Sequence, residues 1–142
     1  MDLSASNLDV VVKDSVFDPL GSSPDTAEKI VRVRIKDNRT LYRVWMYLEG
    51  NDLPFVDNVT YTLHPSFAER VFRVPRSSTN PNCSLVIWTW GTFEVNVRIE
   101  DKKGRVYEVI HPLTYDEQLQ RKDIKFWRDE EAPPSSRPRL KR

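Results

Sequence analysis

Cysteine is almost missing from this chain, since Cys83 is the only one among 142 residues. That excludes an intrachain disulfide and favours a reducing intracellular compartment. Excess charge is also missing, because the formal net charge is only +1. Domains that bind nucleic acid usually carry a strongly basic face, so we do not expect nucleic acid as a partner. No apolar run approaches the roughly 18 residues of a membrane-spanning helix, so we expect no membrane contact.

The first residues, Met1 to Asn7, lack the basic segment and apolar stretch of a secretory signal, so we expect a cytoplasmic protein. Two motifs resemble glycosylation acceptor sites, at Asn58 and Asn82, and without a signal peptide we treat both as chance matches.

Hydrophobic residues alternate with polar ones along most of the chain, which is typical of half-buried β-strands. Phe93 to Arg98 is the clearest case, because Phe93, Val95 and Val97 alternate with polar neighbours. Turn residues separate the strands at nearly regular spacing. This pattern predicts an all-β protein, an immunoglobulin-like antiparallel β-sandwich of about eight strands. The predicted strands lie near residues 8–12, 31–36, 41–48, 59–63, 70–74, 85–88, 93–99 and 106–110.

One short C-terminal helix is predicted after the strands. Thr114 can cap it, with Glu117 as the capping-box partner, and Tyr115, Leu119 and Phe126 then fall on one side. Beyond it the chain is charged and rich in proline and serine, as in disordered tails. We therefore divide the chain into an N-terminal strand and loop within the sandwich, the main sandwich with its helix, and a charged tail, at residues 1–29, 30–127 and 128–142.

Two strand–loop junctions place aromatic residues beside small hydroxyl residues. The first is Leu63-His64-Pro65-Ser66-Phe67, and the second is Trp88-Thr89-Trp90-Gly91-Thr92-Phe93. Loops at such junctions often carry binding and catalytic residues. Phe67 and Trp90 lie where a strand gives way to a loop, so we interpret them as walls of a slot. Phe93 begins an inward alternation and is expected to be mainly core.

Catalytic and metal sites are weaker interpretations of the same residues. His64 and Ser66 are two apart and share one face of a strand, but no third residue is placed to orient the histidine as in a hydrolase. A local hydrogen bond between them is the simpler reading, and we expect no enzymatic activity. His64, His111 and Cys83 lack the close spacing of a structural zinc site. We expect no metal and no cofactor.

A slot between two aromatic faces selects flat, neutral groups by stacking. A free ammonium could gain a cation–π contact, but burying it between the rings without a counter-charge costs more than the contact returns. The residues alone therefore favour a planar amide as ligand.

Three segments of the chain together resemble the prokaryotic branch of the YEATS domain family. They are Val44-Trp45-Met46-Tyr47-Leu48-Glu49-Gly50, the stretch from Phe55 to Phe67 that ends in Leu-His-Pro-Ser-Phe, and Trp90-Gly91-Thr92-Phe93. Their order and spacing agree with the family from roughly Tyr42 to Tyr115. The resemblance implies an immunoglobulin fold and a reader of acylated lysine, whose side chain threads between two loop aromatics.

By matching positions, the resemblance implies that Phe67 and Trp90 are these walls. His64 would line the channel, Ser66 would bond the amide, and the backbone N–H of Trp90 would meet the acyl carbonyl. Gly91 would allow close approach of the loop, and Phe93 would support the end of the pocket. Thr89 departs from the glycine of many eukaryotic members, which predicts a narrower entrance because β-branched residues restrict the backbone.

Two functions of different kinds follow. The first is a binding module for an acylated-lysine protein or peptide, or for a similar ligand with a planar amide. The second is an adaptor that recruits a signalling or defence effector protein through a sheet edge or the helix after Thr114, without a small ligand. The connection from Arg76 to Asn82, rich in Ser, Asn and Pro, is expected to form a mobile rim.

Overall fold

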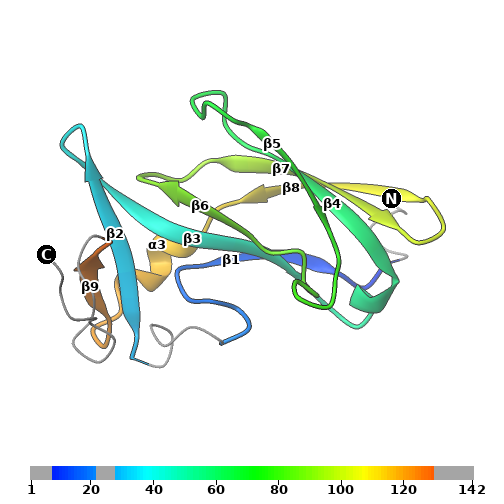
Figure 1. Ribbon diagram of the computed structural model, residues 1–142, viewed down its shortest axis with the longest axis horizontal. Coiled ribbons are helices and arrows are strands. Elements are labelled where there is room, and N and C mark those ends of the chain that lie inside the picture. The colour runs from blue at the N-terminus through cyan, green and yellow to red at the C-terminus, as the bar shows by residue number, and fades with distance from the viewer. Residues whose placement is uncertain (1–7, 22–27, 130–142) are drawn as a thin grey trace, which may run out of the picture.

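Two β-sheets pack face to face to form the body of the protein (Figure 1). The computed structural model describes residues 8–21 and 28–129, and all structural statements below refer to these ranges. The all-β sandwich predicted from the periodicity is confirmed, with nine strands in the described part of the chain.

The first sheet is built around β3, the longest strand, which has three partners. Strand β1 pairs with the second half of β3 and β2 with its first half, whereas β6 pairs with the middle. Because the β6 register overlaps both of the others, β1 and β2 must share one edge of β3, and β6 takes the opposite edge. Strand β9 pairs with β2 in parallel. The bounds are β1 Val11–Ser15, β2 Ile30–Lys36, β3 Arg39–Glu49, β6 Leu85–Thr89 and β9 Lys125–Arg128.

The second sheet has the antiparallel order β5-β4-β7-β8. A register shift between Val56 and Asn58 marks a bulge at the start of β4, next to the 3₁₀ turn η1. The short helix α3 follows β8. The bounds are η1 Leu53–Phe55, β4 Val56–Thr62, β5 Val71–Pro75, β7 Glu94–Asp101, β8 Val106–Pro112 and α3 Tyr115–Gln118.

The core lies between the two sheets, and the period-two pattern explains its membership. Alternate residues of each central strand are buried, as in β7, where every second side chain is buried and the others are mostly exposed. Fully buried members include Val44, Met46 and Leu48 of β3, and Val59 and Tyr61 of β4. The prediction that Phe93 is mainly core holds only in part, because its side chain is half-buried and packs against the cluster from outside.

The C-terminal segment differs from the predicted helix. Helix α3 is a single turn, and the segment that carries Phe126 forms β9 instead. The capping box does not form, because the Thr114 hydroxyl donates to Asp14 of β1 at 3.2 Å rather than capping the turn. Strand β9 also reaches Arg128, the first residue of the predicted tail, whereas residues 130–142 lie outside the described part of the chain.

Hydrogen bonds anchor the connection from Arg76 to Asn82, which the sequence suggested as a mobile rim. Arg76 Nε donates to the carbonyl of Pro81 at 2.9 Å, and the Leu48 N–H donates to the carbonyl of Asn82 at 2.9 Å. The buried Tyr61 hydroxyl donates to the adjacent carbonyl of Cys83 at 2.7 Å. These bonds tie the connection to the core of the sandwich.

Candidate functional site

One cavity of about 390 Å³ opens between the β4–β5 loop and the β6–β7 junction. Its volume lies within the range of small-ligand pockets, about 300–1,000 Å³. All seven residues singled out from the sequence line it, and they come from segments more than 20 positions apart. Sequence reasoning did not assign Trp88 and Thr92 to the site. The lining residues are His64, Ser66, Phe67, Trp88, Thr89, Trp90, Gly91, Thr92 and Phe93.

The first loop is closed by short backbone bonds, from the Leu63 N–H to the Arg70 carbonyl at 2.8 Å and from the Phe67 N–H to the His64 carbonyl at 3.0 Å. Inside this turn, the Ser66 N–H donates to His64 Nδ1 at 3.0 Å, and Ser66 Oγ lies 2.9 Å from the same nitrogen. Because a backbone N–H can only donate, Nδ1 is the acceptor and the imidazole proton sits on Nε2. His64 and Ser66 are thus joined by a local hydrogen bond within the turn, and His64 Nε2–H is left as a donor for other groups.

Phe67, Phe93 and His64 form an aromatic cluster at the cavity. The Phe67 and Phe93 ring centroids lie 5.4 Å apart and tilted, and those of His64 and Phe93 lie 5.9 Å apart. Both distances are typical of favourable edge-to-face contacts. Phe67 is half-buried against the core, so its packing with Phe93 fixes one side of the cavity.

Two hydroxyl groups hold the backbone of the second loop by donating to the same carbonyl, that of Gly91. Thr89 is buried, and its Oγ1 donates to the Gly91 carbonyl at 3.0 Å. Tyr115 of α3 donates to the same carbonyl at 2.9 Å. Burial raises the pKa of Tyr115 to about 12, with a hydrogen bond to Thr89 acting in the opposite direction, so the phenol is protonated and can donate at neutral pH. Sequence analysis predicted that Thr89 narrows the entrance, but its hydroxyl also fixes the loop backbone.

Gly91 is not required by the geometry of the loop. It lies outside the positive-φ region, and a Cβ built there would meet no heavy atom within 4 Å. The structure therefore gives no support for the prediction that Gly91 is needed for close approach of the loop. A side chain at this position would instead project into open space beside the cavity.

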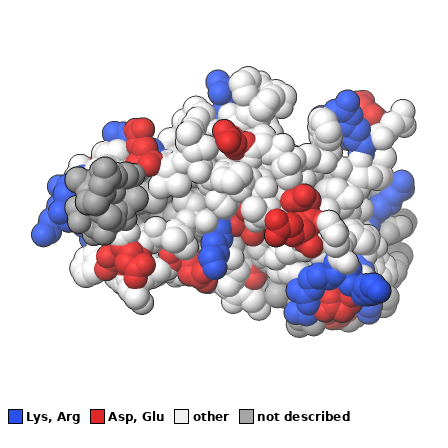
Figure 2. Space-filling model, turned by 180° about the vertical axis from the view of Figure 1, so that it is seen from behind, with Lys and Arg blue, Asp and Glu red and all other residues white. Residues whose placement is uncertain are grey.

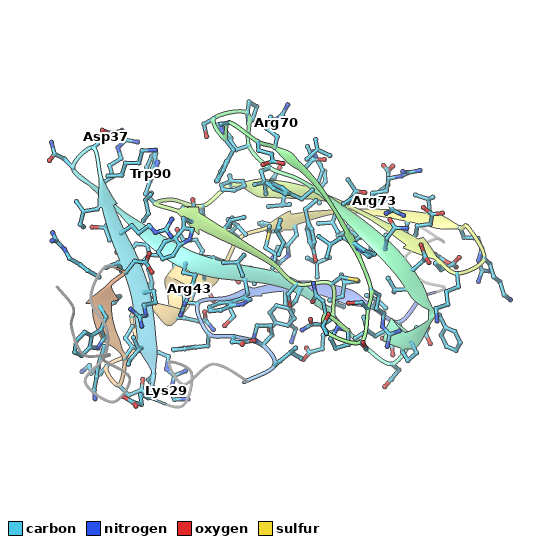
Figure 3. The ribbon with its side chains drawn as sticks, in the orientation of Figure 1. Lys29, Asp37, Arg43, Arg70, Arg73 and Trp90 are labelled. Carbon is cyan, nitrogen blue, oxygen red and sulfur yellow. The ribbon has the colours of Figure 1, made fainter. Side chains whose placement is uncertain are left out.

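Trp90 belongs to a different environment from Phe67, because 58% of its surface is exposed. The guanidinium carbon of Arg39 lies 4.2 Å from the Trp90 ring centroid. Arg39 is the first residue of β3 and follows the β2–β3 turn, whose residues Asp37 and Asn38 have φ of 52° and 64°. Figure 3 shows Trp90 beside this turn, with Arg70 on the first loop. The hairpin thus contacts the site through Trp90 without lining the cavity itself, and no local sequence signal connects it to Trp90.

Within the described ranges, no three His, Cys, Asp or Glu side chains lie close enough together to bind a metal ion. Cys83 is buried away from the cavity, and burial raises the pKa of its thiol to about 11, so it is protonated and unreactive at neutral pH.

Within residues 8–21 and 28–129, no helix is long and apolar enough to cross a membrane. On the face shown in Figure 2, acidic and basic residues are interspersed.

The family model described as the prokaryotic YEATS domain matches residues 42–114, just over half of the chain. The chain belongs to the prokaryotic YEATS domain family. The resemblance carried by the three sequence segments is therefore confirmed. No curated protein matches the chain.

The matched residues include the whole lining of the cavity but not the hairpin that contacts Trp90. It covers both loops that line the cavity, from His64 to Phe93. Strands β1, β2 and β9 lie outside it, and so does Arg39. YEATS domains are binding modules, so membership indicates a binding function for this prokaryotic YEATS domain.

Proposed function

We propose that this prokaryotic YEATS domain is a non-catalytic reader that binds an acylated lysine, or a similar planar amide, in the cavity between its two loops. One observation carries the proposal: residues chosen from two separate sequence blocks line a single cavity of about 390 Å³. The ligand-binding residues in this proposal are His64, Ser66, Phe67, Thr89, Trp90, Gly91 and Phe93.

The lining favours a neutral amide over a charged amine. Aromatic side chains supply most of the walls, and such faces stack well on flat, polarisable groups. Polar groups at the rim are few: His64 Nε2–H is a donor, whereas the Thr89 hydroxyl is bonded to the loop backbone. An amide can form hydrogen bonds with one such donor and one acceptor. A buried ammonium loses its hydration shell, and these groups do not make up for that free-energy cost. No carboxylate lines the cavity to act as its counter-charge.

Isothermal titration calorimetry with one peptide in three forms tests this function: acetyl-lysine, crotonyl-lysine and unmodified lysine. We expect the two acylated peptides to bind and the unmodified peptide to bind at least about tenfold more weakly. Phe67→Ala and Trp90→Ala should each weaken binding of the acylated peptides about tenfold, since each removes one stacking surface.

Phe55→Ala is the matched control. Phe55 is as exposed as Trp90, at 58%, but lies at the opposite end of β4 from the cavity. Its removal should leave affinity within about twofold, because surface substitutions away from a site have small effects. If no peptide binds, or if the Phe67 and Trp90 variants bind like wild type, the reader function is wrong. The adaptor function without a small ligand then becomes the better interpretation.

A further inference from the structure

Two arginines stack on aromatic residues that line the cavity, Arg39 on Trp90 and Arg34 on Trp88. The Arg39 guanidinium stacks on Trp90 at 4.2 Å, within the range of favourable cation–π contacts. Within the described part of the chain, no carboxylate lies at ion-pair distance from Arg39. Arg34 makes a similar stack on Trp88, but its Nε is 3.0 Å from an Asp129 oxygen, which neutralises it. Arg39 therefore brings an uncompensated positive charge to the cavity wall.

The backbone holds Arg39 in this place. Arg39 pairs with Lys36 across a two-residue turn whose residues, Asp37 and Asn38, both have positive φ. Such turns match the twist of a hairpin and fix its register. The hairpin therefore fixes the backbone of Arg39, from which its side chain reaches Trp90. Arg39 lies outside residues 42–114, so the family match does not account for it.

We propose that Arg39 is a specificity-determining residue of the cavity, which excludes cationic ligand groups from Trp90 and so selects the neutral amide. This inference rests on the proposed reader function. The guanidinium takes up one face of the indole, which leaves the other face to a ligand. A cation on that second face would sit on the opposite side of the ring from Arg39 and be repelled by it, whereas a neutral amide would not.

Repulsion of this kind is electrostatic, so it makes a distinct prediction. At a separation of two ring contacts, about 8 Å, and with the effective dielectric constant of a protein surface, the unscreened repulsion amounts to about a thirtyfold effect on affinity, which the salt of a dilute buffer reduces to about tenfold. It should weaken as salt screens the two charges. A purely structural role, in which Arg39 only supports the Trp90 ring, would lower the affinity for every ligand alike.

The experiment compares one peptide that carries either acetyl-lysine or trimethyl-lysine, which is a permanent cation. The readout is the ratio of the two dissociation constants, trimethyl-lysine over acetyl-lysine, measured by calorimetry. We expect Arg39→Met to lower this ratio about tenfold at low ionic strength, because methionine keeps an unbranched side chain without the charge. Arg39→Lys should keep the wild-type ratio, and raising the salt to about 0.5 M should reduce the wild-type ratio. If the trimethyl-lysine peptide binds wild type too weakly to measure, Arg39→Met must make its binding strong enough for calorimetry to detect.

Lys36→Met is the control, since it removes the same charge from the residue opposite Arg39 in the same hairpin. Its ratio should stay within about twofold of wild type, because exposed charges contribute little. If wild type binds acetyl-lysine but Arg39→Met leaves the ratio unchanged, or lowers both affinities equally, this inference is wrong and the reader function stands. If wild type binds neither peptide, both are wrong.

Discussion

At the residue scale, the position of the second loop depends on a hydroxyl group from a distant element. Tyr115 is 2% exposed and donates to the Gly91 carbonyl at 2.9 Å, although 24 positions separate them. Thr89 donates to the same carbonyl from below the loop. Two donors on one carbonyl restrain the segment that carries Trp90. A preorganised loop binds its ligand more tightly, because less ordering is required on binding.

Tyr115→Phe should therefore weaken ligand binding as well as stability. Loss of one hydrogen bond is expected to lower the free energy of unfolding by about 1 kcal/mol and the affinity for an acetyl-lysine peptide several-fold. Urea unfolding and calorimetry measure the two effects. Tyr107→Phe is the matched control, because Tyr107 is also buried and its hydroxyl donates to Asp101 at 3.0 Å, away from the cavity. It should lose stability without losing affinity, and an equal loss of affinity in both variants would contradict this role of Tyr115.

At the element scale, the β2–β3 turn carries strain that its residues are suited to bear. Asn38 has φ of 64°, a left-handed conformation that asparagine and glycine tolerate better than other residues. Asn38→Ala should lower the free energy of unfolding by about 1–2 kcal/mol, whereas Asn38→Gly should be nearly neutral. Urea denaturation of both variants measures the difference. If alanine and glycine behave alike at this position, the turn is not strained as the backbone angles indicate.

The same hairpin shows how far sequence reasoning reaches within an element. Alternation in Val31, Val33 and Ile35, followed by Asp37-Asn38, predicted both the strand and the turn. Period two depends only on which residues face the core, so it can be read locally. That Arg39 stacks on Trp90 depends on how β3 and β6 pair, with Tyr42 opposite Thr89. Pairing between distant strands leaves no local signal, and this contact could not be predicted.

Strand β9 was missed for a related reason. Tyr115, Leu119 and Phe126 have helical spacing, and Phe126 nonetheless lies on a strand that is parallel to β2. An apolar residue is compatible with either period over so short a stretch, and pairing with the exposed edge of β2 decides between them. The residues that line the cavity were easier to single out, because each block combines aromatic and hydroxyl residues at a strand end. What they bind together is still a prediction.

At the scale of the whole molecule, Asp14 joins the two sheets. It lies on β1 of the first sheet, its side chain is completely buried, and its Oδ1 accepts from His111 Nε2 of β8 at 2.7 Å. It also accepts from the Thr114 N–H, at 3.1 and 3.0 Å for its two oxygens. One carboxylate therefore holds both sheets and the start of α3, the helix that positions Tyr115 under the second loop.

Asp14→Ala should lower the free energy of unfolding by about 3 kcal/mol, because it leaves His111 and the Thr114 N–H without their buried acceptor. Lys13→Ala, the neighbouring variant, removes an ion pair with Glu49 at 2.7 Å whose side chains are 50% and 57% exposed. That loss should be below about 1 kcal/mol, because exposed ion pairs contribute little. Urea denaturation of both variants gives the comparison, and similar losses would show that Asp14 does not join the sheets. If it does, Asp14→Ala should also weaken acetyl-lysine binding, because α3 and Tyr115 are then less well placed to hold the Gly91 carbonyl.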